Sequence, residues 1–161
     1  MSDDLRAVLG KHRKPDPTLV SKLPRITCAG CRQERAKVCS SHQKAKCDGC
    51  GNYITSAHMH LDYVGHADVT ATLIDIDPEW SWEPAAWTPD GAPATIEHGG
   101  TIEMWGRLRL LGVERIGVGS CEKGKPDVGK ELVGDFLRNA AMRFGVFVDL
   151  WSKSEAASVE V

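Results

Sequence analysis

The sequence lacks the long apolar runs of membrane proteins and of secreted precursors. No stretch of 18 apolar residues occurs in the 161-residue chain, so no transmembrane helix is expected. The first residues, MSDDLRAVLGKHRKPDP, also lack the apolar centre of a signal peptide. We therefore expect a cytoplasmic protein that has no membrane partner.

The sequence also lacks the signatures of two enzyme classes. No phosphate-binding loop of the GxxxxGK type, followed by Ser or Thr, is present, so no ATP-driven activity is expected from that motif. The zinc deaminases carry H-x-E followed downstream by P-C-x-x-C, whereas His58-Met59-His60 has no glutamate and follows its cysteine pair. We expect a protein that is not an enzyme.

Basic residues are missing from the middle of the chain. Residues 63–106 contain no Lys or Arg but eight Asp and Glu. Residues 1–62 carry 11 basic and 6 acidic side chains, a net charge of +5, and residues 63–161 carry 9 and 16, a net charge of −7. Because a phosphate backbone would be repelled by the acidic middle, any nucleic-acid surface must use the basic parts on either side of it.

Cysteine and histidine are concentrated between residues 28 and 60 in a plan that occurs twice. A CxxC pair is followed, after a seven-residue spacer, by a second pair of Cys or His residues. Two thiolates on such a tight turn reach one ion, and Cys/His sets favour zinc. A disulfide framework is disfavoured, because five cysteines cannot all pair and nothing indicates export. The predicted zinc ligands are Cys28, Cys31, Cys39 and His42, and then Cys47, Cys50, His58 and His60.

Two pairings of these ligands stay open. The repeated spacer favours two sites, Cys28/Cys31/Cys39/His42 and Cys47/Cys50/His58/His60, and hence two zinc ions per chain. The alternative is a single ribbon made of the two CxxC pairs alone, whose 15-residue spacer also fits a zinc ribbon. In the two-site arrangement the protein fills every coordination position, as in structural rather than catalytic zinc sites.

Four parts are expected along the chain. They are a flexible N-terminal arm over residues 1–27, a zinc-binding module over 28–62, a domain over 63–153 and a tail over 154–161. The fold class expected for the whole is α+β, with a zinc-binding module before a small antiparallel β-sheet and packed helices.

Helical and extended patterns alternate within the 63–153 domain. A helical face begins near Asp62 and ends at Asp77-Pro78, and Glu79–Glu83 alternates like a strand. A hairpin around Gly112 follows, and its first strand carries alternating apolar and polar residues. The apolar face is Ile102, Met104, Leu108 and Leu110, and the polar face is Glu103, Trp105, Arg107 and Arg109. An exposed aromatic ring beside two arginines suits single-stranded nucleic acid.

The clearest helical pattern lies between Lys130 and Lys153. Its apolar residues form one broad stripe, and Gly145 supplies a stop signal. The stripe consists of Leu132, Val133, Phe136, Leu137, Ala140, Ala141 and Phe144. Periodicity by itself predicts only a helix that packs against a core.

The residues of this helix carry a family resemblance. The string Lys130-Glu131, Gly134-Asp135, Leu137-Arg138 and Arg143-Phe144-Gly145 resembles the signature helix of the single-strand annealing recombinases, the Rad fifty-two family and its phage relatives. The resemblance extends back through the hairpin (residues 105–119) and Trp80-Ser81-Trp82 to Tyr63-Val64-Gly65-His66, which matches the family's opening helix. It is closest to short versions from actinobacterial phages, which would place the protein in the host cytoplasm.

The resemblance implies a recombination and repair protein that binds single-stranded DNA and anneals complementary strands without ATP. It also implies a homo-oligomer, as a ring or a helical filament, with a single-strand binding protein or an exonuclease as a further partner. Asn139 and Met142 stand where the family has basic residues, so only Arg138 matches directly. The predicted DNA contacts are Arg107, Arg109, Lys130, Arg138 and Arg143, together with Arg32, Arg35 and Lys37 in the zinc-binding module.

Two hypotheses stay open for the role of the basic zinc-binding module. In the first, the module supplies the phosphate contacts that the helix lacks, and in the second it only braces the fold. An alternative function for the whole chain is a zinc-ribbon adaptor or regulator that binds another protein, which the acidic middle would suit.

Overall fold

Two compact units make up residues 2–152, the part of the chain that the computed structural model describes. The smaller unit spans residues 16–64, and the larger unit combines residues 2–15 with residues 65–152. The expected tail over 154–161 lies outside the described residues. Within residues 2–152, no helix has the length and apolar character needed to cross a membrane.

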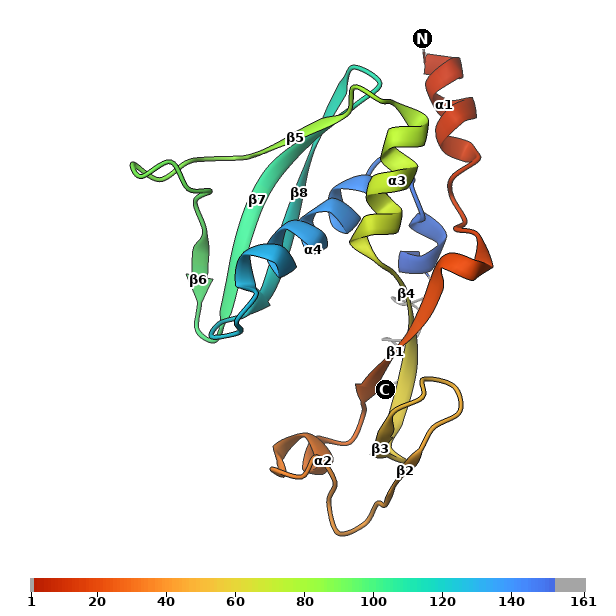
Figure 1. The fold of residues 1–161 in the computed structure, drawn as a ribbon, viewed down its shortest axis with the longest axis vertical. Helices are drawn as coiled ribbons and strands as arrows, with labels where there is room; N and C mark the ends of the chain where they lie inside the picture. The colour runs from red at the N-terminus through yellow and green to blue at the C-terminus, as the bar shows by residue number, and fades with distance from the viewer. Residues whose placement is uncertain (1, 153–161) are drawn as a thin grey trace. The chain divides into compact units, whose positions relative to one another are not determined.

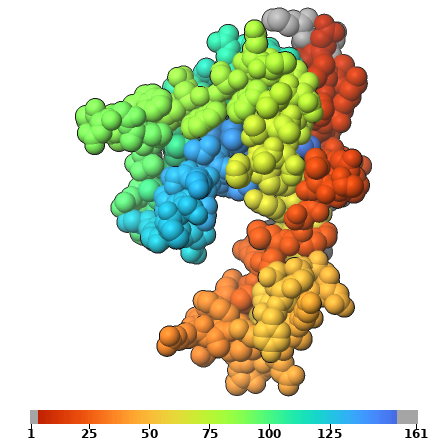
Figure 2. Space-filling model, in the orientation of Figure 1, coloured from red at the N-terminus to blue at the C-terminus, as the bar shows by residue number. Residues whose placement is uncertain are grey.

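A four-stranded antiparallel sheet forms the centre of the larger unit (Figure 1). Its strands are β5 (Ser81–Pro84), β6 (Ile96–His98), β7 (Thr101–Leu110) and β8 (Val113–Glu122). Strand β8 pairs along one edge of β7, while β5 and β6 pair with the two ends of its other edge. The connection between β5 and β6 projects away from the sheet (Figure 1 and Figure 2).

A two-residue turn closes the long hairpin of β7 and β8. Leu111 and Gly112 both have positive φ angles, 51° and 74°, as in the tight turns whose twist matches that of paired strands. The Leu111 amide donates to a carboxylate oxygen of Asp77 at 2.7 Å. This bond helps to hold a non-glycine residue in the left-handed region, which such residues rarely adopt.

Helix α4 (Val128–Met142) packs on one face of this hairpin through its apolar stripe. The helix approaches closely because three inward-facing positions of the strands are glycines. A β-carbon at Gly106 would lie 2.8 Å from the Phe136 ring, and one at Gly119 would lie 2.2 Å from the carbonyl oxygen of Leu132. The third is Gly117, which faces Ala140. Phe136 is fully buried there, and such burial contributes about 1.5–3 kcal/mol.

Helices α3 (His66–Ile76) and α1 (Ser2–Gly10) complete the larger unit. Helix α3 packs against α4. The ring of His66 lies beside Gly134, so His66 is part of the packing between these two helices. The segment after α1 returns to the end of α4: the Phe147 amide donates to the carbonyl of His12 at 2.8 Å, and Arg13 forms an ion pair with Asp149 at 3.0 Å.

The smaller unit contains two short antiparallel sheets. Strand β1 (Val20–Ile26) pairs with β4 (His58–Val64), and β2 (Lys44–Lys46) pairs with β3 (Tyr53–Thr55). The short helix α2 (Ala29–Gln33) follows β1.

The expected fold class is confirmed, since the chain is α+β with small antiparallel sheets, packed helices and Cys/His clusters near the N-terminus. Two local expectations need correction. The segment expected to be a flexible arm contains α1, a 3-10 turn (Pro17–Leu19) and β1. The helix expected from Asp62 begins at His66, because the residues up to Val64 pair with β1.

Candidate metal centres and nucleic-acid interface

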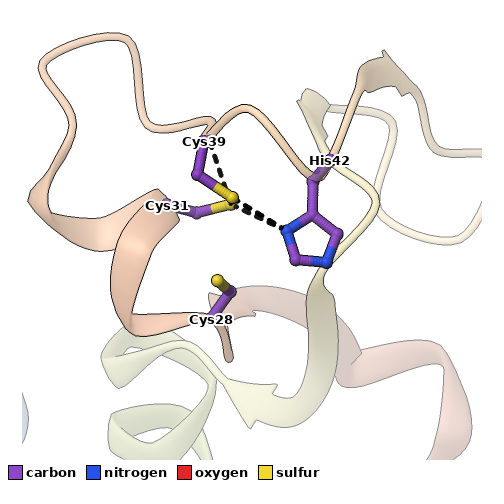
Figure 3. A group of neighbouring side chains, drawn as sticks. All are labelled: Cys28, Cys31, Cys39 and His42. Carbon is purple, nitrogen blue, oxygen red and sulfur yellow. Dashed lines mark hydrogen bonds between the residues drawn. The ribbon is translucent and has the colours of Figure 1, made fainter.

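The first Cys/His group gathers four side chains from two neighbouring segments (Figure 3). Cys28 and Cys31 come from the start of α2, and Cys39 and His42 come from the loop that leads to β2. The α2 turn places the sulfurs of Cys28 and Cys31 near one another. Gly30 leaves room for Cys39, because a β-carbon at position 30 would lie 3.4 Å from the β-carbon of Cys39. All four ligand atoms lie within 4.8 Å of one another.

The spacing in this group suits a tetrahedral ion. The Cys31 sulfur lies 3.6 Å from that of Cys39 and 3.4 Å from Nδ1 of His42, and the Cys39 sulfur lies 3.2 Å from the same nitrogen. A tetrahedral zinc with Zn–S bonds of about 2.3 Å separates two sulfurs by about 3.8 Å. The donors therefore already stand close to the distances that such an ion requires.

Cys31 is the buried member of the group and receives hydrogen bonds itself. Its sulfur lies 3.3 Å from the hydroxyl of Thr55 and accepts from the Cys39 amide at 3.4 Å. The Thr55 hydroxyl is the main reason why the pKa of Cys31 is lowered to about 6, although burial opposes it. The Ser41 amide acts to lower the pKa of Cys39, but burial and the neighbouring sulfurs of Cys31 and Cys28 raise it overall. The thiolate form is thus favoured more at Cys31 than at Cys39.

The second group combines a turn with a strand. Cys47 and Cys50 lie on the turn between β2 and β3, and His58 and His60 lie two residues apart on β4, so that their side chains share one face. The Cys47 sulfur lies 3.3 Å from Nε2 of His60, and the Cys50 sulfur lies 3.9 Å from Nε2 of His58. The backbone amides of Cys50 and Gly49 lower the pKa of Cys47.

Surrounding groups orient both histidines of this second site. Nδ1 of His58 lies 2.5 Å from the carbonyl oxygen of Thr55, so this nitrogen donates and Nε2 is left as the free ligand atom. Gly49 lies against the His60 ring, where a β-carbon would come within 2.5 Å of the imidazole. The second site therefore needs glycine at position 49 for steric reasons.

The two groups are positioned to bind metal ions, and their Cys/His composition is consistent with zinc. The ligands gather as in the two-site interpretation: each CxxC pair lies with the Cys/His pair that follows it, rather than with the other CxxC pair. Each group offers four protein ligands, which fills a tetrahedral site and leaves no position for a substrate.

Sequence reasoning missed Thr55, which touches both groups. Its hydroxyl contacts Cys31 in the first group, and its carbonyl accepts from His58 in the second. Its side chain is fully buried. No pattern in the sequence marks this residue, because its role depends on β3 passing between the two groups.

The predicted hairpin contacts lie on the face of the sheet that α4 does not cover. Arg107 lies 3.6 Å from Glu114 and 4.0 Å from Glu83, so carboxylates partly neutralise it. Trp105 and Arg109 share this face, and Trp105 is 41% exposed. On this face, Trp105 and Arg109 therefore lie beside Arg107, whose guanidinium is already paired with carboxylates.

The predicted helix contacts belong to α4, on the other side of the sheet. Lys130 lies 3.8 Å from Asp127, and Arg138 lies 3.5 Å from Asp135. Arg143 is exposed just after the helix. The structure thus does not bring the hairpin arginines and the helix residues together on one face, as a single groove would require.

Asn139, where the resemblance leads one to expect a basic residue, has a structural role here. The side-chain oxygen of Asn139 accepts from the Val118 amide at 3.1 Å, and Asp135 accepts from the Ser120 amide at 2.8 Å. Both amides belong to the outer edge of β8. The polar side of α4 therefore covers a strand edge, a common way of protecting such edges.

The predicted basic contacts of the zinc-binding module are exposed. Arg32, Arg35 and Lys37 lie between Cys31 and Cys39, and within the described part of the chain no carboxylate lies within 4.0 Å of any of them. The Lys37 ammonium donates to the Arg32 carbonyl at 2.7 Å. Metal binding at the ends of this segment would fix all three side chains on one short loop.

In comparisons with known proteins, no family model, no curated protein and no solved structure matches the chain.

Proposed function

We propose that the protein binds single-stranded DNA and promotes annealing of complementary strands without ATP, as a non-enzymatic recombination and repair protein. The observation that carries the proposal is the place of α4. Along the chain, helix α3 and strand β5 come first, the long β7–β8 hairpin follows, and α4, which carries the Lys130–Gly145 string, comes last. Helix α4 packs on the hairpin. This is the order of elements that the resemblance to the annealing recombinases implies.

Such a function requires cations and exposed surface rather than a catalytic centre. Base pairing itself supplies the free energy of annealing, so the protein needs only to hold two strands with their phosphates neutralised and their bases accessible. Trp105 and Arg109 on the uncovered face, and Arg143 beyond α4, are exposed groups of the required kinds.

We further propose that the two Cys/His groups hold two Zn²⁺ ions per chain. The ions would have structural roles, because the smaller unit has few buried apolar residues: within the described residues 16–64, only Cys31 and Val64 are buried hydrophobic residues. Zinc binding would then supply much of the folding free energy. It would also hold Arg32, Arg35 and Lys37 in place as additional phosphate contacts.

Assembly and partners complete the proposal. We expect a homo-oligomer, either a ring or a helical filament, that meets a single-strand binding protein or an exonuclease during recombination. Oligomerisation would bury the exposed large apolar side chains of the larger unit, which include Trp87, Ile96 and Ile116.

A second candidate function is a zinc-ribbon adaptor or regulator that binds another protein. One observation favours it: three of the predicted DNA contacts, Arg107, Lys130 and Arg138, lie within 4.0 Å of carboxylates. Cations that are paired in this way offer less to a phosphate backbone.

A direct binding measurement separates the two candidates. Zinc-loaded protein is titrated into fluorescently labelled single-stranded DNA, with the duplex of the same length as competitor, at several salt concentrations. We expect binding that prefers the single strand and weakens steeply as salt rises. An adaptor would show no measurable affinity for either form at moderate salt.

A further inference from the structure

The basic residues of the larger unit fall into two classes. The first class has a carboxylate within 4.0 Å and consists of Arg13, Arg107, Lys123, Lys125, Lys130 and Arg138. Among the described residues, six basic side chains of this unit have no carboxylate so close. They are Arg6, Lys11, Lys14, Arg109, Arg115 and Arg143.

Two of these six, Arg6 and Arg115, line one pocket. The pocket, of about 320 Å³, lies between α1 and the segment that follows α4. Arg13 lines it as well. In the sequence, Lys11, Lys14 and Arg143 are next to the lining residues Gly10, Arg13 and Phe144. The volume lies within the range of pockets that hold small ligands, about 300–1,000 Å³.

The pocket joins an apolar lining to a cationic rim. Leu5, Leu9 and Phe144 form the apolar lining. The Arg115 guanidinium lies 5.2 Å from the centre of the Phe144 ring, above its face, and a guanidinium plane in such a place can itself stack with a base. The apolar residues and the Arg115 plane therefore suit an uncharged aromatic group, and the arginine charges suit an anion.

Two of the three arginines are already held in place. Arg115 donates to the carbonyl of Arg143 at 2.7 Å, and Arg13 donates twice to one carboxylate oxygen of Asp149, at 3.0 and 3.3 Å. A guanidinium has five N–H donors, so both keep donors for a ligand. Because these side chains are ordered beforehand, binding costs less conformational entropy.

The nearby acidic groups do not cancel the charge of the rim. Asp149 neutralises Arg13, which leaves Arg6 and Arg115 without a carboxylate partner among the described residues. Asp4 lines a separate pocket with Asp77 and Glu79. Asp4 and Arg6 of α1 therefore line different pockets.

We infer that this pocket binds one nucleotide of a single strand, with the base over the apolar lining and Arg115, and a flanking phosphate on Arg6. The inference rests on the proposed function and moves its main phosphate contact in the larger unit away from the β7–β8 hairpin. A single strand fits and a duplex does not, because a stacked and paired base cannot enter the pocket.

The test uses the full-length, zinc-loaded protein and a labelled thymidine homopolymer as the probe. The variant Arg6→Gln/Arg115→Gln is compared with Lys123→Gln/Lys125→Gln, which removes the same charge from lysines already paired with Glu97 and Glu131. We expect the pocket variant to bind about tenfold more weakly or worse. Its salt slope should fall by about 0.7 units, because the variant no longer neutralises the phosphate at Arg6. The control should bind like the wild type.

A second variant guards against misfolding, since Arg115 also holds the Arg143 carbonyl. Arg6 is exposed and has no carboxylate partner within the described chain, so Arg6→Glu should fold normally and still weaken binding. Wild-type affinity in both pocket variants, with the wild type binding well, would overturn the inference and leave the proposed function intact. A wild type that does not bind the homopolymer would overturn both.

Discussion

The buried hydroxyl of Thr55 lies 3.3 Å from the sulfur of Cys31. This contact is the main reason why the pKa of the thiol is lowered to about 6, and so it favours the thiolate that binds metal. Since the carbonyl of the same threonine accepts from His58, one residue of β3 supports a ligand in each Cys/His group.

The first prediction concerns the pH at which metal is released. In Thr55→Val the hydroxyl donor is gone, so the pKa of Cys31 rises and protons compete with metal at less acidic pH. The midpoint of zinc release should therefore shift toward neutral pH, as measured with a chromogenic chelator while the pH is lowered. Thr55→Ser keeps the hydroxyl and should release zinc near the wild-type pH. An unchanged midpoint in a folded valine variant would show that the hydroxyl does not matter.

The second prediction concerns metal content. Elemental analysis should find two zinc ions per chain in the wild type and one in Cys39→Ser, because Cys39 is a ligand only in the two-site arrangement. Cys121→Ser is the control: Cys121 belongs to neither group, and burial raises the pKa of its thiol. One zinc per chain in the wild type, retained in full by Cys39→Ser, would support the single ribbon instead.

The third prediction concerns the packing of α4. Alanine at Gly119 would place a β-carbon 2.2 Å from the Leu132 carbonyl oxygen, so the helix must move. Overpacking of this kind costs about 1–3 kcal/mol, and the melting temperature should fall by several degrees. Gly100→Ala, which would meet no atom within 4 Å, should leave it nearly unchanged. Equal melting temperatures for both variants would mean that α4 does not rest on this glycine.

Sequence patterns located the Cys/His ligands, the α4 stripe and the β7–β8 hairpin because each of these is encoded locally. Cysteine pairs two residues apart share one turn, and Met104, Leu108 and Leu110 alternate as a half-buried strand should. Gly145, at φ 96°, follows the end of α4 as its stop signal predicts.

The features that sequence reasoning missed depend on contacts between distant segments. Strand β1 contains Pro24 and has little alternation, and it becomes a strand by pairing with β4. Val64 fits the helical period that follows it, yet its pairing with Val20 keeps it in a strand. The pocket lined by Arg6, Arg13 and Arg115 brings together residues that are far apart in the sequence. Its one local signal was the basic run Lys11–Lys14, which stands in the expected arm.

The fourth prediction concerns the exposed loop between Cys31 and Cys39. Charge reversal at Arg32, Arg35 and Lys37 leaves every candidate metal ligand in place. If the loop contacts phosphates, single-strand affinity should fall, and the salt slope should drop by about 0.7 for each phosphate that the loop no longer neutralises. Zinc content and melting temperature are measured on the same samples and should not change. Full affinity in the reversed variant would leave the zinc-binding module with a bracing role only.

The most direct measurement of the central claim is the rate of strand annealing. Two complementary oligonucleotides, one carrying a fluorophore and the other a quencher, are each coated with zinc-loaded protein and mixed without ATP. The account predicts duplex formation much faster than for naked strands, no further gain from added ATP, and no signal from non-complementary strands. Annealing at the rate of naked strands, across protein concentrations that saturate the DNA, would contradict it.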